Sequence, residues 1–255
     1  RFGSKAYSKP RISIDLAAVL EWNTDKRYLA ELDAAGLPVV ATEYLEPGDD
    51  PTEALAGPDV AADVAGTTVT LATHDSFATS DGIFDTFTAE TGIEVEVVTS
   101  GDAGSMVSQA ILTAGDPVAD VMFGIDTTFL CRGTAAGLFV PFVPDGLDAV
   151  DDDLRLASDD LATPIDVGDV CVNYSLDAFP DPDEAPATLA DLTEPAFADA
   201  FVTQNPETSS PGMSFLLATI AQYGEDGWEG YWEDLRDNGL EVTSGWDEAY
   251  NGSFG

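Results

Sequence analysis

Hydrophobic and polar residues follow two different periods along most of the chain. A period of two, or a short apolar run between turn residues, is typical of β-strands, and apolar residues spaced three and four apart are typical of helices. Strand patterns occur at 68–73, 93–101, 119–126 and 169–179. Helix patterns occur at 80–92, 104–115, 127–139, 188–202 (where a strand follows the helix), 209–224 and 228–239. Because strands and helices alternate, the pattern predicts βαβ units and an α/β fold with a parallel or mixed sheet.

The first fifty residues have a pattern of their own. Apolar residues such as Leu16, Val19 and Leu20 recur at helical spacing, which predicts helix over 11–35, followed by a short strand. The stretch 46–66 is rich in Pro, Gly, Asp and Ala and lacks an apolar period, which is typical of a linker. The predicted organisation is a mainly helical appendage, a linker and one larger domain, at 1–50, 51–66 and 67–255.

The distribution of charge sharpens this division. The formal net charge is −39, from nine basic and 48 acidic residues. Six of the basic residues lie within the first 27 positions, whereas residues 66–255 hold three basic and 36 acidic residues. Repulsion of this size argues against nucleic acid or an anionic membrane as a partner. Two interpretations stay open, namely a salt-adapted acidic surface and a cationic ligand.

The sequence carries few signals for a membrane segment, a metal or a catalytic centre. Apolar runs are too short to span a bilayer, and the first residues lack the apolar core of a signal peptide. His74 is the only histidine and no CxxC spacing exists, which argues against a zinc site. Cys131 and Cys171 could form a disulfide in an exported protein or remain as two buried thiols. We expect no metal, no cofactor and no catalytic residue.

Candidate binding residues follow from the predicted sheet. In open α/β sheets, ligands bind beyond the carboxyl ends of the strands, near helix N-termini. Three predicted strand ends carry polar clusters, at 74–76, 124–126 and 208–210. His74, Asp75 and Ser76 are adjacent in sequence and therefore cannot form a catalytic triad, because neighbouring strand residues point to opposite faces. His74 is predicted to be a wall or packing residue.

The stretch around 208–212 is the most informative of the three. A Ser or Thr precedes Pro211 at a predicted helix start, where backbone N–H groups are unpaired and the helix dipole is positive. Ser209, Ser210 and the amide of Gly212 could hold a phosphate there. An ordinary capped helix start is the alternative interpretation.

Two aromatic residues could bind a flat cation. Trp246 and Tyr250 lie four residues apart, so on one helical turn they face the same side. Asp75, Asp126 and Asp166 could add negative charge. The aromatic residues at 228–232 have amphipathic helical spacing and are predicted to pack in the core.

The larger domain resembles the thiamine-binding periplasmic proteins, a branch of the type II solute-binding fold. The resemblance covers residues 67–251 and rests on four motifs in order. These motifs are HDSF at 74–77, GID at 124–126, TSSPG at 208–212 and GWDEAY at 245–250.

This resemblance implies a type II periplasmic-binding-protein-like fold with two lobes that close on thiamine, thiamine monophosphate or thiamine diphosphate by a hinge motion. It implies a non-enzymatic binding component of an ABC importer, located in the periplasm or at the cell surface, with ABC permease subunits as partners. Carried over by position, the residues lining the first lobe are Asp75, Ser76, Phe77 and Asp126. The phosphate or hydroxyethyl end would contact Thr208, Ser209, Ser210 and Gly212, and the rings would pack on Trp246 and Tyr250.

Departures from the family pattern define the alternatives. Residues 1–50 resemble a fragment of an ATP-grasp ligase, with Lys26 at the position of a phosphate-binding lysine but without the family's metal-binding acids. The family continues for on the order of one hundred residues beyond Gly255, so the sequence predicts a C-terminally truncated fold with exposed apolar surface. The alternatives are a binding protein for another cation, such as a polyamine or ferric iron, and a ligase fragment in a composite chain. The adjacent tyrosines that iron binding would need are missing.

Overall fold

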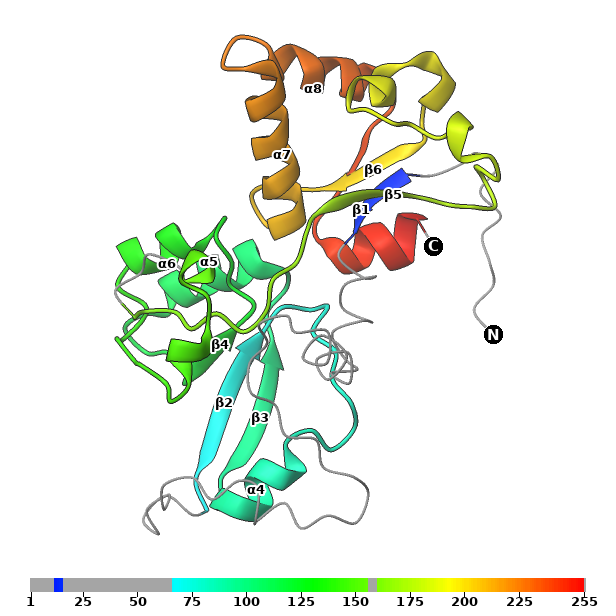
Figure 1. Ribbon diagram of the computed structural model, residues 1–255. Coiled ribbons are helices and arrows are strands. Elements are labelled where there is room, and N and C mark those ends of the chain that lie inside the picture. The colour runs from blue at the N-terminus through cyan, green and yellow to red at the C-terminus, as the bar shows by residue number, and fades with distance from the viewer. Residues whose placement is uncertain (1–11, 16–65, 156–159, 255) are drawn as a thin grey trace. The chain divides into compact units, whose positions relative to one another are not determined.

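The computed structural model describes residues 12–15, 66–155 and 160–254 of the 255-residue chain (Figure 1). The chain divides into two compact units, which are described separately. Unit 1 comprises Arg1–Leu16, Gly101–Met106 and Asp169–Gly255, and unit 2 comprises Ala17–Ser100 and Val107–Gly168.

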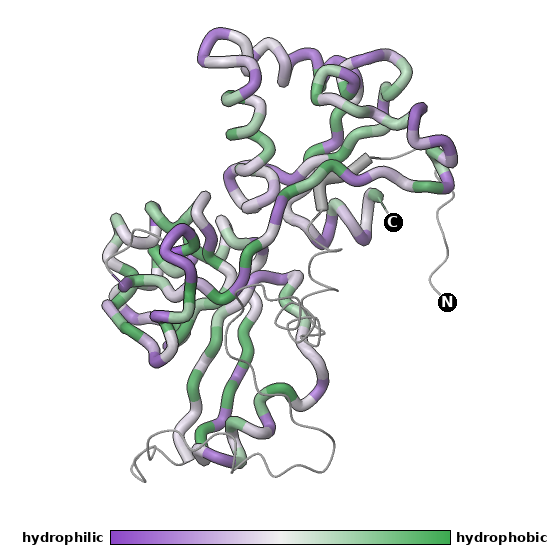
Figure 2. Tube along the Cα trace, viewed as in Figure 1, coloured by the Kyte–Doolittle hydropathy of each residue, from purple (hydrophilic) through white to green (hydrophobic). Residues whose placement is uncertain are grey.

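Unit 2 contains a parallel three-stranded sheet. Its strands are β2 (Thr68–Thr73), β3 (Glu94–Thr99) and β4 (Val121–Phe123), in the order β3-β2-β4. The central strand β2 runs in register with β3 over its whole length, and hydrophobic residues mark both strands (Figure 2). The strands predicted at 68–73, 93–101 and 119–126 are thus confirmed, the last two in shorter form. Helices of this unit include α4 (Asp85–Thr91) and α6 (Leu130–Ala135).

Two predictions for unit 2 were wrong in detail. The helix predicted at 80–92 begins only at Asp85, because Gly82 adopts a left-handed conformation (φ 75°) and closes a turn before it. Ile83 is 53% exposed and Val121 is 49% exposed, so neither the predicted helix face nor strand β4 is buried. The large exposed apolar side chains of this unit include Leu112, Val140, Phe142 and Ile165.

Unit 1 contains a mixed four-stranded sheet in the order β5-β1-β6-β7 (Figure 1). The strands are β5 (Cys171–Tyr174), β1 (Ile12–Asp15), β6 (Phe201–Gln204) and β7 (Glu241–Thr243). β1 is antiparallel to β5 and parallel to β6, and β6 is parallel to β7. All four residues of β6 are buried, so both faces of this strand are covered.

The core of unit 1 forms where two helices pack on the sheet. The helices are α7 (Ser210–Tyr223) and α8 (Trp228–Asp237), both close to their predicted bounds. Phe215 of α7 packs between Phe201 of β6 and Trp232 of α8, with ring centroids 5.4 and 5.5 Å apart. The Tyr231 hydroxyl donates to the carbonyl of Leu189 at 2.7 Å. The predicted packing role is therefore confirmed for Tyr231 and Trp232.

The strand β1 corrects the prediction for the N-terminal segment. Residues 12–15 lie in a strand of the unit 1 sheet and not in the helix predicted at 11–35. Sheet pairing outweighs a weak local helical spacing here, since β-structure depends on partners distant in sequence. Residues 1–11 and 16–65 lie outside the described residues, and with them the rest of the predicted appendage and the linker.

The remaining elements are short helices. The helix predicted within 188–202 is replaced by two 3₁₀ turns, η4 (Ala190–Thr193) and η5 (Pro195–Phe197), because Pro195 has no N–H for a continuous helix. The other 3₁₀ turns are η1 (Leu147–Ala149), η2 (Asp152–Leu154) and η3 (Pro182–Glu184). The chain ends in a π-helix, η6 (Glu248–Phe254).

Cys131 and Cys171 are both free and exposed, so neither the disulfide nor the buried thiols left open by the sequence is found. Within the described residues, no helix has the length and apolar character needed to cross a bilayer.

Candidate functional site

The candidate site of unit 1 lies at the carboxyl ends of two neighbouring parallel strands. β6 ends at Gln204 and β7 ends at Thr243, and these two residues are register partners. The loops that follow are joined, because the Asn205 N–H donates to the Thr243 carbonyl at 2.8 Å and the Thr208 hydroxyl donates to the Ser244 carbonyl at 2.5 Å. The loop after β6 enters helix α7, and the loop after β7 enters the aromatic stretch of η6. This is the position that the α/β architecture predicts for a ligand.

Two serines at the start of α7 have buried hydroxyls with unused hydrogen-bonding capacity. Ser209 is the N-cap residue, with extended backbone, and its side chain makes no capping hydrogen bond. Ser209 is 0% exposed and Ser210 is 9% exposed, yet neither Oγ has a hydrogen-bond partner within the described part of the chain. A buried polar group without a partner costs about 1–3 kcal/mol. The side-chain capping hydrogen bond of an ordinary capped helix start is therefore not formed by Ser209. Both hydroxyls lie beside the positive helix end, and their role as ligand donors stays a prediction.

Gly212 has a packing role that the sequence did not reveal. A Cβ at this position would overlap the carbonyl oxygen of Gln204 and lie 3.0 Å from the carbonyl carbon of Asn205. Glycine is thus needed where α7 approaches the end of β6. The role of the Gly212 amide as a ligand donor stays a prediction.

The start of helix α5 (Ala103–Leu112) belongs to the same cluster. The Thr208 carbonyl accepts hydrogen bonds from the N–H groups of Gly104 and Ser105, at 2.9 and 3.3 Å. Asp102 is buried, and its Oδ1 accepts from the Ala103 N–H at 2.7 Å. Its Oδ2 accepts from the Trp246 N–H at 2.9 Å. Asp102 therefore connects α5 to the aromatic residues that follow β7.

Those aromatic residues form a stacked ladder. The rings of Trp246 and Tyr250 lie 4.8 Å apart at an interplanar angle of 16°. Tyr250 and Phe254 lie 5.4 Å apart at 25°. Tyr250 and Phe254 lie in the π-helix η6, and Trp246 precedes it by two residues. The predicted juxtaposition of Trp246 and Tyr250 is confirmed, and Phe254 is a third member that the same four-residue spacing could have indicated.

The ladder is held at both ends of η6. Glu248 Oε2 accepts from the Ser244 N–H at 2.9 Å and from the Ser244 hydroxyl at 2.7 Å. These hydrogen bonds, the backbone one first, hold the pKa of Glu248 below its ordinary value. At the other end, the Ser253 hydroxyl donates to the carboxylate of Glu241 in β7.

The second group of predicted residues lies in unit 2, at the carboxyl ends of β2 and β4. His74 Nδ1 and Ser76 Oγ are 2.8 Å apart, and the rings of Phe77 and Phe123 meet at 5.3 Å. The His74 ring stacks on Phe123 and lies against Gly124, where φ is 101° and a Cβ would overlap the imidazole. The predicted packing role of His74 agrees with these contacts.

The predicted acids of unit 2 differ in their surroundings. Asp126 Oδ1 accepts from the N–H and the hydroxyl of Thr128, at 2.9 and 2.6 Å, and thereby shapes the turn before α6. Asp75 and Asp166 are exposed. Asp75, Ser76, Phe77, Asp126 and Asp166 all belong to unit 2, whereas the other six predicted residues belong to unit 1.

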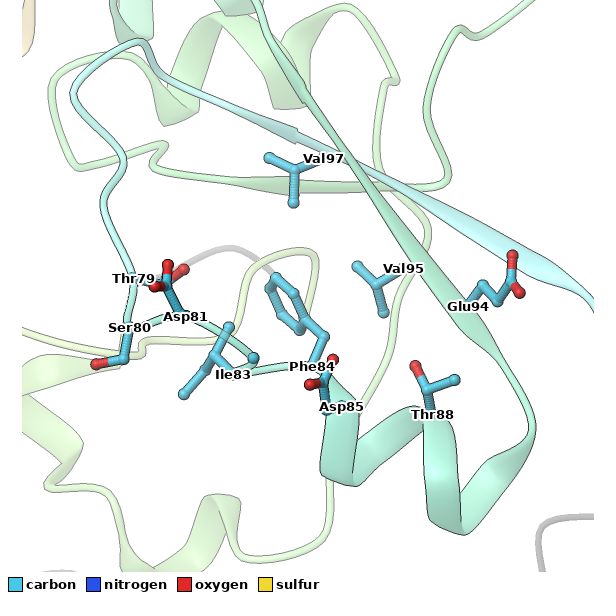
Figure 3. Close-up of a pocket in the computed structure, with 11 residues that line it drawn as sticks. Thr79, Ser80, Asp81, Ile83, Phe84, Asp85, Thr88, Glu94, Val95 and Val97 are labelled. Atoms are coloured by element: carbon cyan, nitrogen blue, oxygen red, sulfur yellow. The ribbon is translucent and has the colours of Figure 1, made fainter.

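Unit 2 also has an open groove between α4 and β3 (Figure 3). Apolar side chains of Ile83, Phe84, Val95 and Val97 line it, and Asp81, Asp85 and Glu94 add carboxylates. None of the predicted site residues lines this groove. The described residues hold no group of three or more His, Cys, Asp or Glu side chains arranged to bind a metal ion.

Comparison with known proteins identifies the family. The family model of the bacterial extracellular solute-binding proteins matches residues 116–253, which is more than half of the chain. The chain belongs to this family. The family consists of binding proteins, which confirms the expectation that the chain is not an enzyme.

Several relatives are thiamine-binding proteins. The chain is 32% identical to the thiamine-binding periplasmic protein of Brucella suis biovar 1 (strain 1330), over 72% of this chain and 54% of that protein. It is 29% identical to the thiamine-binding periplasmic protein of Escherichia coli (strain K12), over 71% of this chain and 55% of that protein. The chain thus spans about half the length of the curated relatives it matches. These matches give no support to the resemblance of residues 1–50 to ATP-grasp ligases.

Solved structures agree on the fold. A periplasmic thiamin-binding protein matches with a TM-score of 0.54 at 25% identity, over 72% of this chain and 57% of that chain. Iron-bound HitA from Pseudomonas aeruginosa matches with a TM-score of 0.55 at 25% identity, over 72% and 58%. The predicted α/β fold of the periplasmic-binding-protein type is therefore confirmed over about 70% of the chain.

Proposed function

We propose that this chain is the solute-binding component of an ABC importer for thiamine or its phosphate esters, working outside the cytoplasm with ABC permease subunits as partners. Its relatives from Brucella suis and Escherichia coli are thiamine-binding periplasmic proteins, which supports this solute class. The observation that carries the proposal is the pair of unpartnered, buried hydroxyls of Ser209 and Ser210. They stand at a helix N-terminus that hydrogen bonds join to an aromatic ladder.

The two halves of this site suit the two ends of the proposed solute. Thiamine is a flat aromatic cation, and an aromatic face attracts a cation by about 0.5–2 kcal/mol. Trp246 and Tyr250 offer such faces. A phosphate or hydroxyethyl group needs hydrogen-bond donors and a positive field, which the two serine hydroxyls and the N-terminus of α7 can supply. The three basic against 36 acidic residues of 66–255 also favour the approach of a cation.

Isothermal titration of the purified chain tests this proposal. Thiamine, thiamine monophosphate and thiamine diphosphate are the ligands, and spermidine, ferric iron and ATP with Mg²⁺ are the competing candidates. Sub-micromolar binding of a thiamine compound, lost in Trp246→Ala, is the expected result. Binding of spermidine or ferric iron without binding of any thiamine compound would show that the solute is another cation. Heat with ATP alone would overturn the proposal and move the activity to the first fifty residues.

A further inference from the structure

The unit 1 sheet contains a strand from the far end of the chain. β1 lies between β5 and β6, and β5 and β6 are not neighbours in the described sheet (Figure 1). Ile12 to Asp15 pair with Tyr174 to Cys171, and Ile12 and Ser13 pair with Phe201 and Val202. More than 150 residues separate β1 from the nearer of its two partners.

Removal of this strand would leave a gap in the middle of the sheet. Adjacent strands lie about 4.8 Å apart, so β5 and β6 are separated by roughly twice that distance and cannot pair directly. Their facing backbone N–H and C=O groups would lose their partners, and β6 is buried along its whole length. Buried, unpaired backbone groups are strongly destabilising. The gap is thus a site that only an extended peptide can fill.

The same strand contacts both elements that carry the candidate site. β1 touches helix α7, which begins with the two serines, and η6, which carries Tyr250 and Phe254. β6, its parallel neighbour, leads directly into the loop at 205–209. The position of β1 therefore affects the serine hydroxyls and the aromatic ladder together.

We propose that residues 12–15 act as an intrachain donor strand that completes the solute-binding unit. Residues 12–15 are then a structural part of the binding protein. Only the effect on solute affinity rests on the proposed function. The placement of residues 12–15 in the sheet is measurable without any ligand.

A cysteine crosslink tests the placement of the strand in the full chain. Asp15 is the register partner of Cys171, and directly opposed strand residues lie about 4.5–5.5 Å apart between Cα atoms, within the range of a disulfide. The variant Asp15→Cys with Cys131→Ser is expected to form an intramolecular disulfide under mild oxidation. Ser13→Cys in the same background is the matched control. Its partner is Asn173, so it faces Cys171 only diagonally, at about 7–8 Å, and should crosslink much less.

The products of oxidation distinguish the possible positions of the strand. A monomeric, crosslinked chain supports the donor strand. A disulfide-linked dimer would show that a second copy supplies the strand, and equal crosslinking of the control or none at all would show that the strand is elsewhere. Each of these latter results overturns the proposal.

A second variant measures the consequence for the site. Ile14→Pro removes a backbone donor from β1, and Ile14→Val keeps it. Hydrogen exchange in Phe201–Gln204 and Cys171–Tyr174 is expected to accelerate at least roughly tenfold in the proline variant only. Thiamine affinity should fall with it. If the native chain binds no thiamine while the crosslink forms, the proposed solute is wrong and the donor strand stands.

Discussion

At the residue scale, the serines at the start of α7 are the least expected feature of the chain. Buried hydroxyls normally have partners, and Ser209 and Ser210 lack them in the described structure. Such an arrangement destabilises the free protein and is relieved when a ligand supplies the missing hydrogen bonds. Stability and affinity should therefore respond in opposite directions when these hydroxyls are removed.

The double variant Ser209→Ala/Ser210→Ala tests this expectation. Its affinity for thiamine monophosphate should fall about tenfold to a hundredfold, because two hydrogen bonds to a charged group are lost. Its urea midpoint should stay equal or rise. Ser214→Ala, one turn further along α7, is the control and should leave affinity unchanged. Unaltered preference for the phosphate ester in the double variant would remove the serines from the site.

Gly212 gives a second residue-scale prediction. Gly212→Ala should lower the free energy of unfolding by about 1–3 kcal/mol, because the added methyl overlaps the end of β6. Gly230→Ala is the matched control, since nothing lies within 4 Å of a Cβ there and the site is inside α8. The control should gain up to about 1 kcal/mol from helix propensity. Urea unfolding of both variants measures the difference in unfolding free energy. Similar changes in the two variants would contradict the close contact between Gly212 and the end of β6.

At the element scale, three segments far apart in sequence meet around Asp102 and Thr208. The start of α5, the loop before α7 and the loop after β7 are joined by backbone groups that accept or donate across the cluster. Hydrogen bonds of this kind hold the aromatic ladder relative to the serines. Loss of one acceptor should therefore disturb the ladder without a change in any aromatic residue.

Asp102→Asn tests this link. The amide keeps one acceptor oxygen, so an NH₂ group would face the N–H of either Ala103 or Trp246. A loss of about 1–3 kcal/mol in unfolding free energy and a weaker near-ultraviolet signal from tryptophan are expected. The exposed acid Asp234, changed to Asn, serves as the control. Identical spectra for both variants would argue against a role of Asp102 in holding Trp246.

Glu248 gives the π-helix a dependence on pH. Because its folded pKa is lowered by the Ser244 donors, ionised Glu248 stabilises the fold above its unfolded pKa, and this contribution disappears as pH falls through the folded value. Glu248→Gln should therefore be less stable than the native chain at pH 7 and converge with it below about pH 4. Thermal unfolding across this pH range measures the difference.

At the scale of the whole molecule, charge opposes folding. A net charge of −39 on 255 residues produces repulsion among the acidic side chains. This repulsion is stronger in the compact state than in the unfolded state, because the charges lie closer together. Family membership explains the two-unit α/β architecture but not this charge, and the salt-adapted interpretation stays a prediction.

Salt should therefore stabilise the chain. Raising KCl from about 10 mM to about 500 mM shortens the screening length from about 30 Å to a few Å, so the urea midpoint is expected to rise. Sucrose at matched osmolality is the control for solvent exclusion and should have a smaller effect. A midpoint that is independent of KCl would show that repulsion among the acids does not limit stability.

The local pattern of the sequence determined the features that depend on near neighbours. The alternation of strand and helix periods, the close of α4 at Gly92, the four-residue spacing of Trp246 and Tyr250 and the polar cluster before α7 were all predicted correctly. Each reflects backbone geometry over one or two turns, which local composition controls. The four motifs that resemble the thiamine-binding proteins also predicted the fold, because each is a short local stretch of sequence.

Only the tertiary structure decided the features that join distant segments. The pairing of Ile12–Asp15 with β5 and β6, the hydrogen bond from Trp246 to Asp102 and the missing partners of Ser209 and Ser210 have no local signature. At residues 12–15 the weak helical spacing was overridden because strand formation depends on partners elsewhere in the chain. Burial and hydrogen bonding are properties of the assembled fold, since each depends on what the rest of the chain places beside a residue.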